Sequence, residues 1–328
     1  MATKTRVLVT GAGGFIGHHL TRSLVQRGYW VRGVDIKEPE FEPTSAHEFA
    51  LLDLRRWDDC LQATRQIDEV YGLAANMGGI GFLQANKGKV VRDNTLINMH
   101  TIEAAHVNGV QRYLFTSSAC VYPMALQATT AVEPLKEEDA YPADAEDGYG
   151  WEKLYMERIC RHYREDFGLG IRVVRFHNIF GPLGTYTGGR EKSPAAICHK
   201  VALACDGDAI EVWGDGEQTR SYCYIDDCIE GIYRLMRSDY HEPLNVGQDR
   251  LISINQLVDM VARIAGKRIA KRYDLSKPQG VRGRNSDNSR LRAVLGWEPA
   301  VSLEEGLAET YRWIAAQVGA PLGQQGAG

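Results

Sequence analysis

The chain has 328 residues, of which 44% are hydrophobic and 24% are charged, a balance typical of a globular protein. Its formal net charge of −4 argues against a nucleic-acid partner, because binding to a phosphate backbone requires a basic surface. A single hydrophobic core usually stops growing before this length, so we expect two lobes.

The sequence shows no signal peptide or membrane-spanning segment, and the spacing of its cysteines does not predict a metal site. The sequence contains no run of about 18 apolar residues, and its first residues, MATKTRV, lead directly into a predicted strand. The seven cysteines are odd in number and include no C-x-x-C pair, which favours free thiols over a disulfide framework or a zinc site. We therefore expect a cytoplasmic protein without a metal centre. Residues 319–328 are mostly small or polar and are predicted to be disordered.

Strand-like and helix-like patterns alternate along the first half of the chain. A β-branched run over residues 6–10 is followed by glycines and by an apolar-periodic stretch from Phe15 to Val25. A second strand is predicted over residues 30–34, ending at Asp35. Further strand-like runs, separated by helical segments, cover residues 69–74, 112–116 and 171–176. This alternation predicts an α/β fold with a doubly wound parallel sheet and right-handed crossovers.

The pattern changes beyond about residue 177. Loops rich in glycine and proline cover residues 181–189, and Gly214-Asp215-Gly216 marks a turn. This composition predicts a smaller lobe that closes over the carboxyl edge of the sheet. We expect a dinucleotide-binding domain over residues 1–176 with a returning segment near 222–250, and a substrate-binding lobe over 177–221 and 251–318.

The first predicted turn has the pattern of a dinucleotide-binding loop. It reads Gly11-Ala12-Gly13-Gly14-Phe15-Ile16-Gly17, with glycines at the spacing G-x-x-G-x-x-G. Glycine permits positive φ and lets backbone N–H groups approach a pyrophosphate at the start of the following helix. A tight turn without a ligand is the alternative, and the position between the first strand and the first helix disfavours it.

Two acids further along the chain fit the same ligand. Asp35 follows Gly17 by eighteen residues, where an acid accepts a hydrogen bond from the ribose 2′-hydroxyl and favours NAD over NADP. Asp53 lies where an acid after the third strand could meet the adenine amino group. A helix N-cap explains Asp53 equally well.

A serine-rich strand end and a later Tyr/Lys pair point to hydride-transfer chemistry. Ser117-Ser118-Ala119-Cys120 follows the strand at 112–116, and Tyr149 precedes Lys153 by four residues, so both share one helix face. A lysine ammonium beside a phenol lowers the tyrosine pKa toward neutrality, as a general base requires, and a serine opposite can bind the reacting hydroxyl. A lone Y-x-x-x-K can also be an amphipathic helix surface, but its place after a dinucleotide loop favours catalysis.

These features, which extend over nearly the whole chain, resemble those of the extended short-chain dehydrogenase/reductase family. Residues 175–182 (RFHNIFGP) are similar to the family's R-x-x-N-x-Y-G-P segment, and residues 214–221 (GDGEQTRS) are similar to its G-x-G-x-Q-x-R motif. The resemblance implies a Rossmann fold that holds NAD and a smaller C-terminal lobe that binds a nucleotide diphosphate sugar. Asn178 and Arg220 can each donate to phosphate oxygens, with a turn residue and a surface ion-pair partner as the respective alternatives.

Three further strings resemble one branch of this family, whose members epimerise GDP-mannose at C3 and C5 to GDP-L-galactose, or at C5 alone to GDP-L-gulose. The strings are residues 77–82 (MGGIGF), 188–196 (GGREKSPAA) and 281–288 (VRGRNSDN). The resemblance implies that Tyr149 and bound NAD⁺ oxidise the sugar at C4, which acidifies the protons on C3 and C5. It further implies that Cys120, with its pKa lowered by nearby cations, is the base on one face of the sugar and that Lys192 is the acid on the other.

The same resemblance implies three sets of site residues. The catalytic set is Ser118, Cys120, Tyr149, Lys153 and Lys192. The cofactor set is Gly11, Gly14, Phe15, Ile16, Gly17, Asp35, Asp53, Leu54, Tyr149 and Lys153. The substrate set is Gly78, Ser118, Ala119, Cys120, Tyr149, Asn178, Glu191, Lys192, Ser193, Lys200, Gln218, Thr219, Arg220 and Arg284.

Further expectations concern two arginines, the remaining cysteines, one histidine and a contact between two copies of the chain. Arg284 is expected at a phosphate, whereas Arg282 can be a surface charge. The six cysteines other than Cys120, and His177, are expected to be structural. Apolar helix faces over residues 94–108 and 149–166 predict a homodimer, with the contact made by Leu96, Ile97, Ile102, Leu154, Tyr155 and Ile159.

Two other functions remain open at this point. A sugar-nucleotide 4-epimerase or 4,6-dehydratase shares the Tyr/Lys pair and bound NAD but does not require both Cys120 and Lys192. A non-enzymatic NAD-binding redox sensor could dispense with Tyr149 and Lys153, and both are present.

Overall fold

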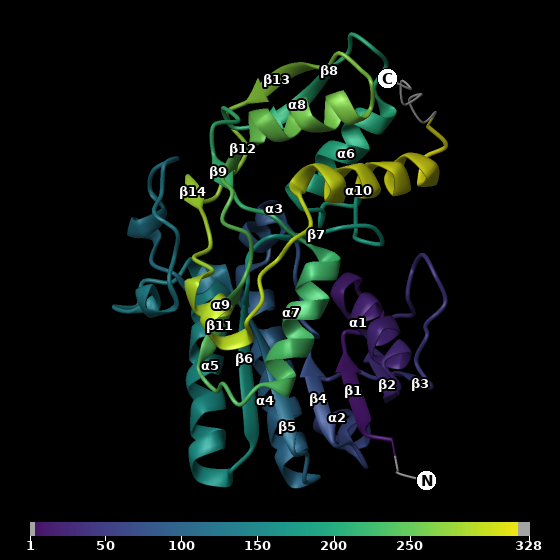
Figure 1. Ribbon diagram of the computed structural model, residues 1–328, viewed down its shortest axis with the longest axis vertical. Coiled ribbons are helices and arrows are strands. Elements are labelled where there is room, and N and C mark those ends of the chain that lie inside the picture. Colours follow the sequence, from purple (N-terminus) through teal and green to yellow (C-terminus); the bar gives the residue numbers. More distant parts are fainter. Residues whose placement is uncertain (1–3, 321–328) are drawn as a thin grey trace.

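A seven-stranded parallel sheet forms the base of the molecule. The computed structural model describes residues 4–320, and the sheet has the strand order β11-β6-β5-β4-β1-β2-β3 (Figure 1). Its strands are β1 (Arg6–Thr10), β2 (Trp30–Asp35), β3 (Glu48–Leu51), β4 (Glu69–Gly72), β5 (Arg112–Ser118), β6 (Gly170–Phe176) and β11 (Pro243–Val246). The chain order reverses between β1 and β4, and such a reversal opens a ligand crevice at the carboxyl ends of the strands. The predicted doubly wound α/β fold is confirmed.

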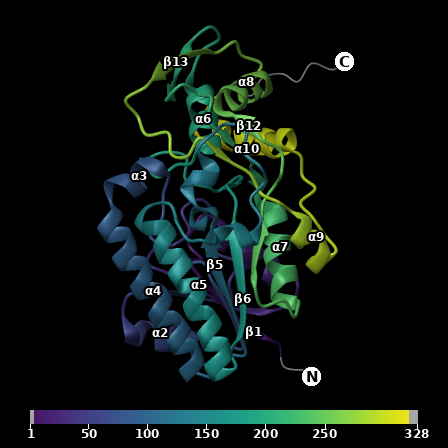
Figure 2. The ribbon, with the colours of Figure 1, turned by 90° about the vertical axis from the view of Figure 1, so that its left-hand side faces the viewer.

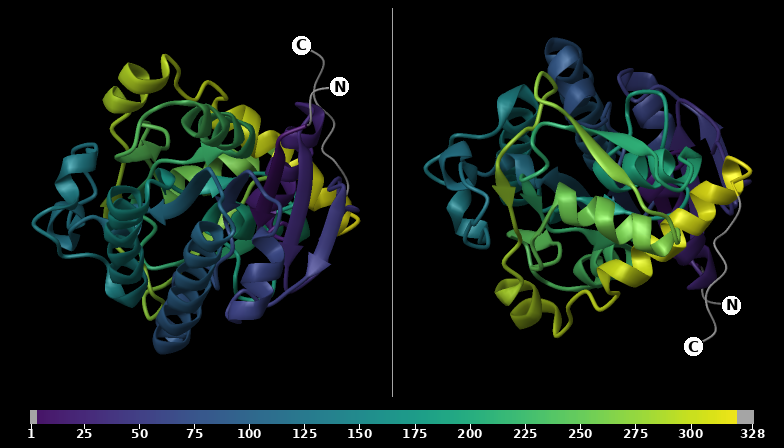
Figure 3. Two further views of the ribbon diagram at one scale, coloured as in Figure 1. Left: turned by 90° about the horizontal axis from the view of Figure 1, so that it is seen from below. Right: turned by 90° about the horizontal axis from the view of Figure 1, so that it is seen from above.

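Helices cover both faces of this sheet (Figures 2 and 3). On one face lie α1 (Phe15–Gln26) and α7 (Ile225–Arg237); on the other lie α2 (Trp57–Thr64), α4 (Lys87–Val107) and α5 (Asp147–Phe167). Strand β1 shows why both faces are covered, because its side chains alternate between two apolar cores. Val7 and Val9 belong to one core and Leu8 belongs to the other, and all three are fully buried.

Several of the elements after residue 177 build a smaller lobe beyond the carboxyl edge of the sheet, whereas α7, β11 and α9 (Ser289–Leu295) pack with the sheet itself (Figure 1). The lobe's helices α6 (Ser193–Leu203), α8 (Ile254–Ile264) and α10 (Leu303–Gln317) pack against one another, and β8 (Ala209–Trp213) pairs with β13 (Ala270–Asp274). The short elements are η1 (Ala119–Val121), η2 (Met124–Gln127), η3 (Glu137–Ala140), α3 (Ile80–Ala85), β7 (Ile179–Phe180), β9 (Thr219–Arg220), β10 (Cys223–Tyr224), β12 (Ile252–Ser253), β14 (Gly283–Arg284) and α9 (Ser289–Leu295). One apolar cluster runs from Val7 on β1 through Ile232 on α7 to Leu307 on α10, so the lobe and the sheet share a core.

Several boundaries and surfaces differ from the sequence predictions. β4 ends at Gly72 rather than at residue 74, and β5 runs on to Ser118. Ile102 and Leu154, expected on an exposed dimer face, are buried in the cores instead. Cys205 is exposed, so the prediction that all six remaining cysteines pack in the interior is wrong for this one.

Two expectations concern the outer parts of the chain. The predicted disordered tail lies, apart from Gly319 and Ala320, outside the described residues. Within residues 4–320, no helix is both long enough and apolar enough to cross a membrane.

A buried ion pair fixes α5 to the sheet beneath the site. Arg175 on β6 donates from Nε and Nη2 to the two oxygens of Glu157 at 2.9 and 2.7 Å, and both side chains are almost fully buried. The Ser117 hydroxyl donates to the same carboxylate at 2.5 Å. His177, expected to be structural, is fully buried beside this network, with Nε2 3.1 Å from Asn245 Oδ1. The pair therefore joins β5, β6 and α5 into one unit.

Replacing Glu157 with alanine tests this coupling. Because the substitution leaves the Arg175 charge buried without its partner, we expect the free energy of unfolding to fall by about 3–5 kcal/mol. The matched control is Glu165→Ala on the same helix, where an exposed ion pair should contribute less than about 1 kcal/mol. Urea denaturation measures both, and equal losses in the two variants would contradict the role of the buried pair.

Candidate active site

A cleft of about 1730 Å³ lies between the carboxyl ends of the strands and the smaller lobe. Its walls contain every residue of the predicted cofactor set and every residue of the predicted substrate set except Thr219. Thr219 and Arg220 are neighbours on β9, so their side chains point in opposite directions. Arg220 lines the cleft, whereas the Thr219 hydroxyl donates to the Thr130 carbonyl at 2.6 Å.

The glycine-rich turn between β1 and α1 forms one end of the cleft. Gly11 has a φ of +71°, and a Cβ on Gly17 would lie 2.1 Å from the Gly11 carbonyl oxygen, so α1 can start here only with glycine at both positions. The N–H groups in the first turn of α1 have no partner within the helix, and the residues that carry them line the cleft. This turn fits the pyrophosphate of a dinucleotide.

Asp35 stands beside this turn at the end of β2. Its carboxylate accepts hydrogen bonds from the N–H groups of Gly13 at 3.0 Å and Ile36 at 2.7 Å. Burial raises the pKa of Asp35, and these backbone hydrogen bonds oppose the rise. The spacing argument missed Gly13, where a Cβ would lie 2.2 Å from the Lys37 carbonyl oxygen. Glycine at this third position allows the Asp35 loop to approach the turn.

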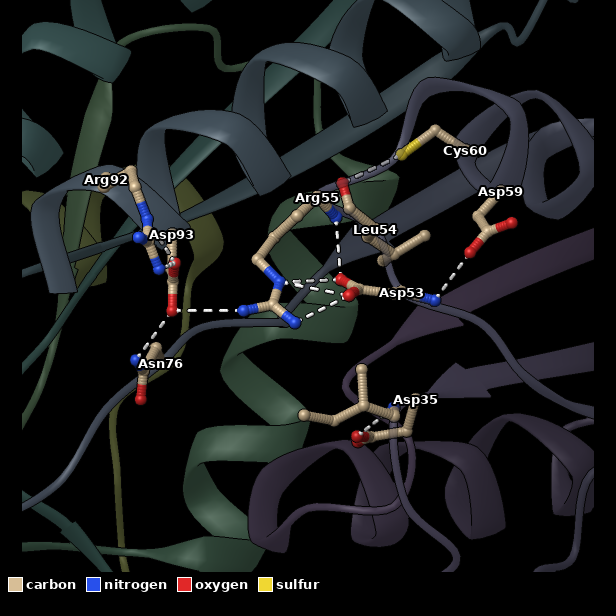
Figure 4. A network of polar contacts seen from close by, with 10 residues as sticks. Asp35, Asp53, Leu54, Arg55, Asp59, Cys60, Asn76, Arg92 and Asp93 are labelled. Carbon is tan, nitrogen blue, oxygen red and sulfur yellow. Dashed lines mark hydrogen bonds and ion pairs between the residues drawn. The ribbon is translucent and has the colours of Figure 1, made fainter. Parts of the chain in front are cut away.

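Asp53 is held by an arginine that the sequence argument missed. Figure 4 shows the Arg55 guanidinium between Asp53 and Asp93, with Nη2 2.6 Å from Asp53 Oδ2 and Nη1 3.4 Å from Asp93 Oδ2. The hydrogen bonds from Arg55 hold the pKa of Asp53 below its usual value. The N-cap of α2 is Arg56, so the alternative that Asp53 caps this helix is wrong. The D-x-R spacing was the signal that could have revealed Arg55.

The start of α5 packs directly against η1 and brings the candidate catalytic groups together. A Cβ on Gly150 would lie 2.2 Å from the Cys120 carbonyl oxygen, and the Glu146 N–H donates to the same oxygen at 2.9 Å. The Ser118 hydroxyl accepts a hydrogen bond from the Cys120 N–H at 3.2 Å. Ser118, Cys120 and Tyr149 therefore line one wall of the cleft.

Tyr149 and Lys153 share one face of α5, as predicted, but the expected electrostatics are not found. Burial raises the pKa of Tyr149, and a hydrogen bond with Ser118 only partly opposes the rise. The Lys153 ammonium lies 4.9 Å from the centre of the Phe115 ring and 5.8 Å from that of Tyr149. The prediction that Lys153 lowers the pKa of Tyr149 toward neutrality is therefore not met by these residues alone.

Arg284 contacts the Cys120 sulfur rather than standing free for a phosphate. Its Nη1 donates to Cys120 Sγ at 3.4 Å and its Nη2 donates to Glu146 Oε2 at 2.6 Å. Burial raises the pKa of Cys120 and the Arg284 charge opposes the rise, so the expected lowering by cations is outweighed. Lys192 is open to the cleft, and desolvation by the surrounding protein lowers the pKa of its ammonium.

The two residues expected to bind phosphate differ in their surroundings. Asn178 has a φ of +46° and donates to the Ser221 carbonyl at 2.9 Å, which favours its alternative role as a turn residue. Arg220 donates only to the carbonyls of Thr219 and Gln279 and forms no ion pair with the described residues. Burial, with the Arg284 charge adding to it, lowers the pKa of Arg220 to about 10. A half-buried cation without an acidic partner among the described residues is suited to an anion in the cleft.

The sequence and the fold are similar to those of known proteins. A model of the NAD dependent epimerase/dehydratase family matches residues 7–247. The chain is 47% identical over 317 residues to GDP-mannose 3,5-epimerase 1 of Oryza sativa subsp. indica, covering 96% of this chain and 83% of the rice protein. It is likewise 47% identical over 315 residues to GDP-mannose 3,5-epimerase of Arabidopsis thaliana, covering 95% and 83%. A crystal structure of UDP-glucose 4-epimerase with UDP-glucose from Thermotoga maritima matches with a TM-score of 0.87 at 25% identity, covering 96% of this chain and all of that one.

The packing of α5 on η1 can be tested with alanine at Gly150. Its Cβ would collide with backbone atoms of Cys120, so we expect the free energy of unfolding to fall by about 1–3 kcal/mol. Gly88 on α4 is the matched control, because a Cβ there meets no atom within 4 Å and alanine should be neutral or stabilise by up to about 1 kcal/mol. Urea denaturation separates the two, and a stabilised Gly150→Ala variant would contradict the close contact.

Proposed function

Because this chain belongs to the NAD-dependent epimerase/dehydratase family, we propose that it is an isomerase that converts GDP-mannose to GDP-L-galactose by epimerisation at C3 and C5, and to GDP-L-gulose by epimerisation at C5 alone. The rice and Arabidopsis relatives suggest the substrate. The observation that carries the reaction is the presence of Cys120 and Lys192 in the same cleft as Tyr149. A 4-epimerase requires only the tyrosine and the cofactor, so the cysteine and the lysine are available for proton transfer at carbon.

NAD is the cofactor of this family, and the residues at the glycine-rich turn fit it. The first turn of α1 can hold the pyrophosphate, Asp35 can accept from the adenosine ribose, and Asp53 borders the same end of the cleft. When bound, NAD⁺ would supply reversible hydride transfer at C4 of the sugar. An acid at Asp35 also repels a 2′-phosphate, which favours NAD over NADP.

Tyr149 is the residue that we assign to the C4 hydroxyl. Its phenolate accepts the hydroxyl proton as the carbonyl forms and becomes the phenol, and Ser118 donates or accepts a hydrogen bond at the same sugar oxygen. Since burial raises the pKa of Tyr149, the phenolate needs a cation close by. The Arg284 charge favours the phenolate, and the Lys153 ammonium lies 5.8 Å from the centre of the Tyr149 ring, on the next turn of the same helix.

Cys120 and Lys192 are the residues that we assign to C3 and C5. A carbonyl at C4 acidifies both neighbouring C–H groups, so each can lose its proton to a base on one face and regain a proton from an acid on the other. Cys120 Sγ is the base and the Lys192 ammonium is the acid. Desolvation lowers the pKa of Lys192, which makes its ammonium a stronger proton donor than a lysine with the ordinary pKa.

Arg220 is the residue that we assign to the diphosphate of the substrate. Its guanidinium has carbonyl partners but no carboxylate among the described residues, and it lines the cleft. A diphosphate would supply the missing negative charge and could accept two parallel hydrogen bonds from the guanidinium. Lys200 and Gln218 line the same wall.

Incubation with GDP-mannose in D₂O tests the reaction. Proton NMR should show loss of the C3 and C5 signals and formation of GDP-L-galactose, without added NAD if the cofactor is retained during purification. Cys120→Ala should slow deuterium incorporation at C5 by about 100-fold or more, because the base is lost. Cys205→Ala, an exposed cysteine, is the matched control and should retain the parental rate.

The outcomes of this experiment separate the assignments. Parental exchange in Cys120→Ala would show that another group is the base. Failure of the parent to exchange C3 or C5 hydrogen, even with NAD added, would overturn GDP-mannose 3,5-epimerisation. Turnover of UDP-glucose under the same conditions would then support the 4-epimerase suggested by the similarity to the Thermotoga maritima structure.

We also propose that the chain forms a homodimer through α4 and α5. These two helices pack against each other and expose large apolar side chains at Leu96, Trp151 and Tyr155. Light scattering should therefore give a mass of twice the 36.5 kDa of one chain. Tyr155→Glu, which places a charge in the contact, should shift the mass toward one chain, and a monomeric parent would contradict the dimer.

A further inference from the structure

All three guanidinium nitrogens of Arg284 donate hydrogen bonds to other residues of the protein. Nε donates to Gln127 Oε1 at 2.6 Å, Nη1 donates to Cys120 Sγ at 3.4 Å, and Nη2 donates to Glu146 Oε2 at 2.6 Å. The Arg284 side chain is 8% exposed and that of Glu146 is 13% exposed. A guanidinium held in three directions has little freedom to follow a ligand, so its position relative to the sulfur is fixed by the protein.

Glu146 is linked to Cys120 in two ways, once directly and once through Arg284. Its N–H donates to the Cys120 carbonyl at 2.9 Å, while its carboxylate binds the guanidinium that donates to the Cys120 sulfur. Glu146 is the residue that precedes α5, and Tyr149 lies three residues further along the chain. One residue thus joins the cysteine, the arginine and the helix that carries the tyrosine.

Contacts between β14 and residues 127–129 fix the position of Arg284 beside Cys120. A Cβ on Gly283 would lie 2.4 Å from the Thr129 carbonyl oxygen, so only glycine lets β14 pack against the segment after η2. Gln127, the last residue of η2, precedes that segment; it is fully buried and donates from Nε2 to the carbonyls of Tyr122 and Pro123 at 3.1 and 3.2 Å. Gln127 is therefore a fixed acceptor for Arg284 Nε.

The charges around the Cys120 sulfur oppose one another. Arg284 favours a thiolate, whereas Glu146 and the burial of the sulfur disfavour it. The other polar groups nearby are the hydroxyl of Ser118, the phenol of Tyr149 and the cations of Lys192 and Arg220, which come from the end of β5, α5, the segment before α6 and β9. Arg284 is the one cation in this set with a hydrogen bond to the sulfur among the described residues.

We propose that Glu146 is a positioning residue whose carboxylate holds the Arg284 guanidinium against the Cys120 sulfur, so that this cation favours the thiolate needed in the acid–base reaction proposed above. The inference rests on that reaction for its purpose, but the coupling itself is a property of three side chains. Glu146 has two opposite effects on the sulfur. Its hydrogen bond places the arginine, and its own negative charge works against the thiolate.

Two isosteric variants separate these effects. Glu146→Gln removes the negative charge but keeps an oxygen acceptor for Arg284, whereas Glu146→Met removes both. The readout is the pH dependence of Cys120 alkylation by iodoacetamide, followed by mass spectrometry of the peptide in a Cys205→Ser background that lacks the exposed cysteine. Neither NAD nor substrate is added, and a thermal melt of each variant restricts the comparison to folded protein.

The proposal predicts an order of alkylation midpoints. Glu146→Gln should shift the midpoint below that of the parent, and Glu146→Met should lie above Glu146→Gln by about one pH unit or more, because the guanidinium is no longer held. Arg284→Gln should raise the midpoint above the parent by about 1–3 units. Arg284→Lys keeps the positive charge but lacks the planar guanidinium with its several fixed donors. The alkylation midpoint of this variant should therefore lie between those of Arg284→Gln and the parent.

Two results would overturn the proposal. Coinciding midpoints for Glu146→Gln and Glu146→Met would show that Glu146 acts through its charge alone. An unchanged midpoint in Arg284→Gln would show that the arginine does not govern the thiol. The predicted order of midpoints in a protein that fails to epimerise GDP-mannose would support the coupling and count only against the proposed function.

Discussion

Helix α5 begins against the carbonyl group of Cys120, at a distance that no side chain on Gly150 would allow. The contact fixes the cysteine relative to the helix that carries Tyr149 and Lys153. Beneath it, the buried pair of Arg175 and Glu157 ties the same helix to β6. The geometry of this wall of the cleft therefore depends on a short-range packing constraint, and the other side chains that line the cleft are arranged around it.

The charges of the cleft are only partly balanced by the protein. Arg284 is shared between a carboxylate and a sulfur, and Asp53 is paired with Arg55. Arg220 has no carboxylate partner among the described residues, and the first turn of α1 presents unpaired N–H groups. These two sets of groups are donors and suit phosphate oxygens, whereas two acceptors of residues that line the cleft, Glu191 Oε2 and Gln218 Oε1, also lack a partner among the described residues and suit donor groups of a ligand. A dinucleotide at one end and a nucleotide diphosphate sugar at the other would complete its hydrogen bonding.

Local patterns in the sequence predicted the fold and most of the lining of the cleft. The strands, the glycine spacing and the four-residue interval between Tyr149 and Lys153 are all short-range signals, and the structure places them as expected. Thr219, which was carried over with the motif as a continuous string, does not line the cleft, because side chains alternate along an extended segment and, of residues 218–220, Gln218 and Arg220 are the two that line it.

Long-range contacts and burial could not be predicted in this way. Arg284 and Cys120 are 164 residues apart, and no sequence pattern links the arginine to the sulfur rather than to a phosphate. The pKa values of Cys120 and Tyr149 were expected to be lowered, because nearby cations can be guessed from motifs. The desolvation that raises both depends on packing from several distant elements.

The most direct test of the proposed chemistry is a crystal structure of the Tyr149→Phe variant with NAD and GDP-mannose, in which slow oxidation at C4 should preserve the bound substrate. We predict that Cys120 Sγ and Lys192 Nζ lie on opposite faces of the sugar ring, each within about 3–4 Å of C3, C5 or their hydrogens. A sugar with both groups on the same face, or with C3 and C5 out of reach of Cys120, would contradict the two-sided proton transfer.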